Sequence, residues 1–149
     1  MSQVVVGGTF NVFHKGHAKL LDAAIITAAF KEAALVVGVT SDELAQGSRS
    51  VPVRPYKARL DDVAKYIERS DIRPRFGPVL YSTIRSYDDM PVMTEGDVLV
   101  VSEETEGRAR KILADNLYIC TVKVIPMVRD KNGEEIHSTK ILEEENGQR

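Results

Sequence analysis

Continuous apolar runs alternate with helical segments along this chain, and this alternation limits the fold more than any other feature. Runs at residues 4–6, 34–39 and 97–102 are typical of strands buried on both faces. Between them, the segment from His17 onward repeats apolar residues with the period of a helix. Strands that alternate with helices form βαβ units with right-handed crossovers. We therefore expect an α/β protein, a Rossmann-like doubly wound sandwich with a mainly parallel five-stranded sheet.

The rest of the chain supplies the remaining elements. A polar loop at 47–50 precedes Pro55, which suits the first residue of a second helix. The other expected elements are a strand within 73–81, a helix over 103–116, a last strand within 118–128, a turn at 130–133 and a helix from Ser138. The tail from about residue 145 is expected to fray. At 149 residues, the chain is expected to form one domain, residues 1–149.

Composition excludes several classes of function. A formal net charge of −2 argues against a general nucleic-acid or membrane surface, because both are anionic. A single cysteine, Cys120, forbids an internal disulfide and fits a reducing compartment. No signal-peptide pattern begins the chain, and every apolar run is far shorter than the ~20 residues of a membrane span. We expect a cytoplasmic protein that binds neither nucleic acid nor membrane. The sequence does not indicate its oligomeric state.

The segment "GGTFNVFHKGH", residues 7–17, follows the first apolar run. In open α/β sheets, ligands bind beyond the carboxyl ends of the strands, which is where this segment lies. Gly7 and Gly8 are expected to turn the chain sharply and to let backbone amides approach a ligand, and Gly16 to give similar freedom before the helix. The helix start then supplies unpaired amides and a positive dipole end. The segment therefore predicts an anion site.

Two of the three histidines in the chain, His14 and His17, belong to this segment. With the Thr9 hydroxyl they offer donors to phosphate oxygens, and the helix dipole favours a neutral imidazole. Capping or surface roles are the alternative for such a pair. A zinc site needs further ligands, and the only other candidates are His137 and Cys120, the latter within the last expected strand. We therefore expect no metal site built by the protein itself.

The order of strand, Gly-Gly-Thr, His-x-Gly-His and helix resembles the "GTFxxxHxGH" signature of the HxGH nucleotidyltransferase superfamily. This resemblance implies transfer of a nucleotidyl group from a nucleoside triphosphate. It places His17 at the α-phosphate in the transition state, His14 at the ATP phosphates, and Thr9 between ATP and the acceptor phosphate. It also implies that ATP contacts the neighbouring residues Gly7, Gly8, Phe10 and Gly16.

A second segment, "IHSTKI" at 136–141, resembles the superfamily's "ISSTxIR" signature, which holds the β- and γ-phosphates. An ordinary helix cap by Ser138 or Thr139 is the alternative. The segment departs twice from the signature, with His137 in place of serine and Leu142 in place of arginine. Lys140 can supply charge, but without the bidentate geometry of arginine. We nevertheless predict that ATP contacts His137, Ser138, Thr139 and Lys140.

Other segments narrow the resemblance. "LVVSEETEGRARKI" at 99–112 is similar to "VVSEETxxGA", and "GVTSDELA" and "RPYKARL" are similar to "GxTSDE" and "PYExR", all from phosphopantetheine adenylyltransferases of the archaeal and eukaryotic type. The resemblance spans residues 4–142, and only 79–96 match poorly. It implies adenylyl transfer from ATP, with Mg²⁺, to 4'-phosphopantetheine, which gives dephospho-coenzyme A and pyrophosphate.

The remaining candidates are polar residues near the expected strand ends. Arg49, Arg54 and Lys57 are expected to bind the acceptor phosphate, although a solvated basic stretch is equally consistent, and Arg59 is expected to make a structural ion pair or to join them. Ser102, Glu103 and Glu104 either contact the nucleotide or simply begin a helix. Two alternatives stay open: a related enzyme whose acceptor is nicotinamide mononucleotide, FMN or glycerol phosphate, and a nucleotide-binding module without turnover.

Overall fold

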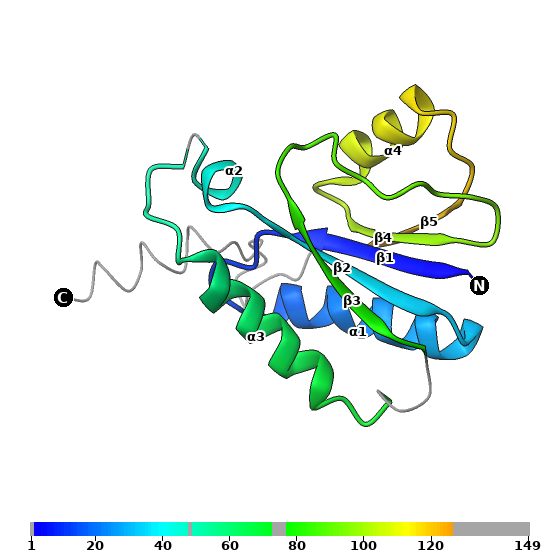
Figure 1. Ribbon diagram of the computed structural model, residues 1–149, viewed down its shortest axis with the longest axis horizontal. Coiled ribbons are helices and arrows are strands. Elements are labelled where there is room, and N and C mark those ends of the chain that lie inside the picture. Colours follow the sequence, from blue (N-terminus) through cyan, green and yellow to red (C-terminus); the bar gives the residue numbers. More distant parts are fainter. Residues whose placement is uncertain (1, 48, 73–76, 127–149) are drawn as a thin grey trace.

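The fold is a single parallel sheet with helices on both faces. The computed structural model describes residues 2–47, 49–72 and 77–126. Within them, five parallel strands lie in the order β3-β2-β1-β4-β5 (Figure 1). Their bounds are β1 Gln3–Gly8, β2 Ala34–Thr40, β3 Val79–Ile84, β4 Val98–Ser102 and β5 Thr121–Ile125. The α/β, Rossmann-like prediction is confirmed, and the sheet is parallel throughout.

The first strand is the centre of the sheet and of the core. It pairs with β2 from Gln3 opposite Ala34 to Gly8 opposite Val39, and with β4 on its other side. Because strand side chains alternate, Val4 and Val6 enter one core cluster while Val5 enters the other. Both faces of β1 are covered, which explains the unbroken apolar run in its sequence.

Four helices complete the described part of the chain: α1 Lys15–Lys31, α2 Asp42–Gln46, α3 Tyr56–Glu68 and α4 Glu106–Asp115. Helices α1 and α3 lie on one side of the sheet and α4 on the other (Figure 1). The predicted apolar face of α1 is confirmed, because all of its members are buried: Leu21, Ala24, Ile25 and Ala28. None of these helices has the length and apolar character that a membrane crossing requires.

Several predicted boundaries are wrong, each for a local reason. Helix α1 begins at Lys15, because the His14 side chain caps it. Helix α2 was not predicted; the Ser41 hydroxyl accepts the Leu44 N–H at 3.2 Å and stabilises this short helix within a polar segment. Pro55 is predicted as the first residue of the second helix, but α3 begins at Tyr56 and Pro55 is its N-cap residue.

Near the far edge of the sheet, α4 begins at Glu106 instead of residue 103, because the Glu103 N–H continues the ladder to the Ile125 carbonyl at 3.1 Å. Cys120 precedes β5 instead of lying within it, and β3 runs from Val79 to Ile84, beyond the predicted segment. The expected turn at 130–133, the C-terminal helix and the tail lie outside the described residues.

Candidate active site

A cavity of about 710 Å³ opens at the carboxyl ends of β1, β2 and β4, and we call it the strand-end cavity. It collects residues from several separate stretches of the chain, between Val5 and Pro126. Among the predicted site residues it is lined by Gly7, Gly8, Thr9, Phe10, His14, Gly16, His17, Arg49 and Ser102. Lining residues that sequence reasoning did not assign to a ligand include Thr40, Ile84, Tyr87 and Arg108. Of these, Thr40 ends a parallel strand, which is a positional signal for a binding residue.

The loop from β1 to α1 turns at an unexpected residue. Gly7 and Gly8 both belong to β1, and the left-handed residue of the loop is Phe10, with φ 52°. The expectation that the two glycines make this turn is therefore wrong. Phe10 tolerates the strained backbone because its ring is 1% exposed and anchored in the core.

Gly7 does not turn the chain; its missing side chain allows a neighbouring side chain to approach the β1 backbone closely. A Cβ atom at this position would lie 2.9 Å from the Ile84 Cδ1 atom of β3. Gly7 stands opposite Gly38 on β2, where an added Cβ would lie 2.7 Å from the same Ile84 atom. The missing side chains at Gly7 and Gly38 therefore make room for the Ile84 side chain, which itself lines the strand-end cavity.

The two histidines of the first motif cap α1 together. The Gly16 N–H donates to His14 Nδ1 at 3.0 Å, and the His14 N–H donates to His17 Nδ1 at 3.3 Å. This is a capping box built from imidazoles, and the two rings stack with centroids 3.9 Å apart. Gly16 lies inside the helix, so its predicted role before the helix is wrong. It supplies space, because a Cβ there would meet His14 Cε1 at 2.8 Å.

His17 is held in an aromatic enclosure. The Phe10 ring meets it edge-on at 5.2 Å and the Phe13 ring lies 5.6 Å away, with His14 stacked on a further side. Burial, followed by the nearby charge of His14, lowers the pKa of His17 from 6.5 to about 3. The positive charge of Arg49 acts in the same direction. The sequence predicts a neutral imidazole, but through the helix dipole; here burial is the main cause.

A neutral His17 has a defined tautomer in this arrangement. Its Nδ1 accepts the His14 N–H, so the ring proton resides on Nε2. The same reasoning puts the His14 proton on Nε2, since His14 Nδ1 accepts the Gly16 N–H. The motif therefore presents imidazole N–H donors, that of His17 without a positive charge, on a cavity large enough for a small ligand.

Arg59 fixes the ends of β1 and β2 beneath this site. It is fully buried and donates to the Thr9 carbonyl at 3.0 Å and to Thr40 Oγ1 at 3.2 Å. It also pairs with Asp42 at 2.9 Å, so its predicted structural ion pair is confirmed. Thr40 in turn donates its hydroxyl to Thr9 Oγ1 at 3.0 Å. Thr9 Oγ1 is the acceptor of the hydrogen bond from Thr40, so the hydroxyl proton of Thr9 points away from Thr40.

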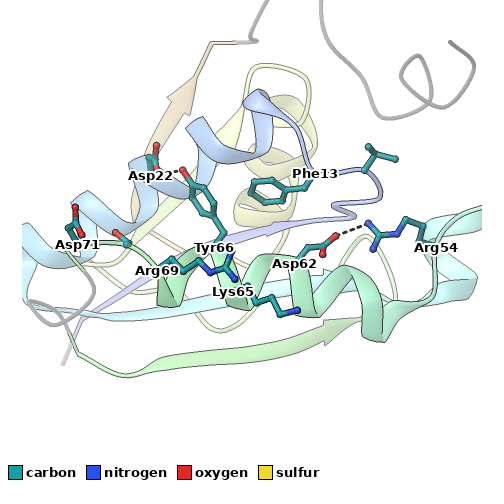
Figure 2. A pocket seen from close by; sticks show the side chains of 10 residues that line it. Phe13, Asp22, Arg54, Asp62, Lys65, Tyr66, Arg69 and Asp71 are labelled. Atoms are coloured by element: carbon teal, nitrogen blue, oxygen red, sulfur yellow. Dashed lines mark hydrogen bonds and ion pairs between the residues drawn. The ribbon is translucent and has the colours of Figure 1, made fainter. Parts of the chain in front are cut away.

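Two of the predicted acceptor ligands do not line the strand-end cavity. Arg54 pairs with Asp62 at 2.6 Å in a separate groove between α1 and α3 (Figure 2). Lys57 is exposed on the first turn of α3. Glu103 is also exposed and is not among the described lining residues, whereas its neighbour Glu104 is.

The second predicted phosphate motif lies outside the described residues, with all four of its members, His137, Ser138, Thr139 and Lys140. Among the residues that are described, no group of three or more His, Cys, Asp and Glu side chains is placed to hold a metal ion. The strand-end cavity is lined by imidazole, hydroxyl, amide and guanidinium donors, which suit phosphate oxygens, together with the carboxylates of Asp89 and Glu104.

Comparison with known families matches this fold and motif to one class. Residues 5–144 match the family model described as cytidylyltransferase-like. The chain therefore belongs to the cytidylyltransferase-like family, a family of nucleotidyltransferases.

The names of individual relatives describe a narrower activity than the name of the family does. A phosphopantetheine adenylyltransferase of Methanothermobacter thermautotrophicus is 33% identical over 94% of this chain and 82% of its own length. A bifunctional phosphopantetheine adenylyltransferase/NTP phosphatase of Thermoplasma volcanium is 33% identical over 97% of this chain, which spans only 44% of that relative. A crystal structure of an Archaeoglobus fulgidus protein with unknown function has a TM-score of 0.65 and 30% identity, covering 92% of this chain and all of that one.

Proposed function

We propose that the protein transfers the adenylyl group of ATP to 4'-phosphopantetheine and releases pyrophosphate, a step of coenzyme A biosynthesis. The relatives named phosphopantetheine adenylyltransferase support this choice, since they align with more than nine-tenths of the chain at 31–33% identity. The strand-end cavity supports it chemically, because its described donors suit phosphate oxygens.

In this mechanism, an oxygen of the acceptor phosphate attacks the α-phosphorus of ATP, a new P–O–P bond forms, and the bond to the β-phosphate breaks. The attacking phosphate is already ionised near neutral pH, so no general base is needed. Catalysis then depends on positioning and on stabilising charge at the transferred group. Mg²⁺ enters as part of the MgATP substrate and neutralises phosphate charge there.

The position of the His17 ring, held by the capping box on the wall of the strand-end cavity, is the observation that carries the proposal. The Nε2–H of this ring is preorganised by the capping box and by the two phenylalanine rings, and it donates to an α-phosphate oxygen as charge develops. The Thr9 hydroxyl, oriented by Thr40, donates to the phosphates between ATP and the acceptor. His14 donates to the ATP phosphates, and the backbone at Gly7 and Gly8 lies against the substrate.

An acceptor panel tests the proposal. Pyrophosphate release is measured with ATP or CTP and each of four acceptors: 4'-phosphopantetheine, nicotinamide mononucleotide, FMN and glycerol phosphate. We expect release with ATP and 4'-phosphopantetheine, with dephospho-coenzyme A as the product. Release with another acceptor alone would overturn the choice of substrate. ATP binding in calorimetry without any product would instead favour a nucleotide-binding module.

A further inference from the structure

Tyr87 and Arg108 form a contact on the wall of the strand-end cavity, outside both predicted motifs. The Arg108 guanidinium carbon lies 4.1 Å from the centroid of the Tyr87 ring, a short cation–π distance. Arg108 belongs to the first turn of α4, while Tyr87 belongs to the connection between β3 and β4. Both line the cavity, so the pair joins two parts of its wall.

Arg108 has no carboxylate partner within the described residues, unlike three other arginines. Arg54, Arg59 and Arg110 each pair with a carboxylate at 2.9 Å or less. Within the described ranges, no carboxylate pairs with Arg108 or with Arg49, the two arginines that line the strand-end cavity. The cation–π contact with Tyr87 leaves N–H groups of the Arg108 guanidinium for an acceptor.

Arg108 supplies positive charge that the overall composition of the chain does not. The formal net charge of −2 supplies no general attraction for a polyanion, so a phosphate substrate depends on local cations. Arg49 is one such cation on the β2 side of β1, and Arg108 is another on the β4 side.

We propose that Arg108, oriented by Tyr87, binds a phosphate oxygen of a substrate held in the strand-end cavity. This inference rests on the proposed function and deepens it, because it assigns a phosphate ligand that the sequence motifs do not contain. The phosphate belongs either to ATP or to the acceptor, which share the same recognition chemistry. Tyr87 is a positioning residue, since it acts through the guanidinium.

Binding measured without turnover tests this proposal. Calorimetry gives the Kd of ATP and, separately, of 4'-phosphopantetheine, for Arg108→Ala, Arg108→Lys and the control Arg110→Ala. Arg110 lies on the same helix, paired with Glu106 and outside the cavity lining. We expect Arg108→Ala to weaken one of the two ligands about 10-fold or more, since it removes a charge-assisted hydrogen bond. Arg108→Lys recovers part of the affinity, Arg110→Ala retains all of it, and the ligand that weakens identifies the phosphate.

Tyr87 variants separate positioning from direct contact. Tyr87→Phe keeps the ring and is expected to keep the affinity. Tyr87→Ala is expected to weaken the same ligand several-fold, and to add little once Arg108 is already alanine, because the two residues act as one unit. Additive losses would overturn the positioning role of Tyr87.

Affinities for both ligands within twofold of the wild type in Arg108→Ala would overturn the proposal as a whole. Arg108 is exposed, so this variant is expected to fold, and circular dichroism checks that it does. Failure of the proposed function is a different result, namely no dephospho-coenzyme A from the wild type. In that case the ATP measurement still tests Arg108, and the acceptor arm uses whichever acceptor the panel identifies.

Discussion

Two hollows of similar size lie on this molecule, and their charged groups are arranged differently. The strand-end cavity has a volume of about 710 Å³, and the groove between α1 and α3 has about 800 Å³. The α1–α3 groove is lined by Val12, Phe13, Asp22, Arg54, Asp62, Lys65, Tyr66, Arg69, Ser70 and Asp71 (Figure 2). Size alone therefore does not distinguish a ligand site from a surface hollow.

Charge pairing distinguishes them only in part, because Arg69 of the α1–α3 groove also pairs with no carboxylate in the described ranges. In the α1–α3 groove, Arg54 pairs with Asp62 at 2.6 Å and the Tyr66 hydroxyl donates to Asp22 at 2.7 Å (Figure 2). In the strand-end cavity, a neutral His17 donor and two arginines without carboxylate partners in the described ranges face the same space. Polar groups whose partners are not supplied by the protein mark the place where a ligand supplies them.

One residue connects the two hollows. The Phe13 ring lies 5.6 Å from the His17 ring and 5.0 Å from the Tyr66 ring. In the proposed mechanism, the Phe13 ring of the α1–α3 groove supports His17 from behind, and the groove takes no part in the chemistry. Variants of His17, in the strand-end cavity, and of Tyr66, in the α1–α3 groove, test whether only the first hollow takes part in catalysis.

The largest expected effect is on turnover, at His17. His17→Asn can keep an acceptor for the His14 N–H but loses the Nε2–H donor, whereas His17→Gln can keep a donor near the Nε2 position. We expect kcat to fall about 10²-fold or more in His17→Asn and His17→Ala, and less in His17→Gln, with a small change in the Kd of ATP. Steady-state kinetics and calorimetry measure both quantities. Equal losses in affinity and turnover would mean that His17 contacts only the ground state.

The second effect is on stability, at Arg59. Arg59→Met removes a fully buried guanidinium from the Thr9 carbonyl, the Thr40 hydroxyl and Asp42. We expect a loss of about 2–3 kcal/mol in the free energy of unfolding, measured with urea, because buried acceptors lose their donor. The matched control is Lys65→Met, whose ion pair with Asp61 is more than half exposed and which should change stability little. Comparable losses in both variants would contradict a special role for Arg59.

These contrasts also show what a sequence can and cannot predict here. The strands and the buried face of α1 follow from local apolar patterns, and the structural pairing of Arg59 follows from its place beside an apolar helix face. The left-handed backbone at Phe10 was not predictable, since it depends on how the core holds the ring. The contact of Tyr87 with Arg108 joins residues with no shared motif, so only the folded chain reveals it.

The third effect is on pH dependence. The folded-state pKa of His17, about 3, lies below its unfolded value of 6.5. The folded state therefore binds fewer protons between these values, and the stability that the neutral ring contributes is complete above pH 6.5 and is lost as the pH falls toward about 3. The slope is at most about 1.4 kcal/mol per pH unit.

Urea unfolding at several pH values compares the wild type with His17→Gln, in which this slope should be smaller. NMR offers a direct test, since the His17 C2–H signal should not shift between about pH 8 and about pH 5. A midpoint near 6.5 for that signal would show that the ring is solvated and charged, and would remove the distinction between the two hollows.

The smallest expected effect lies in the α1–α3 groove. Tyr66→Phe removes the hydrogen bond to Asp22 but keeps the ring that contacts Phe13, so we expect a loss of about 1 kcal/mol or less in the free energy of unfolding and unchanged kcat. Burial and the Asp22 carboxylate raise the pKa of Tyr66 from 10.0 to about 12, so its contribution is present below pH 10 and is lost as the pH rises through about 12. The phenolate absorbance of the wild type minus that of Tyr66→Phe reports this titration. A fall in kcat comparable to that of His17→Ala would show that the α1–α3 groove takes part in catalysis, and the separation of the two hollows would fail.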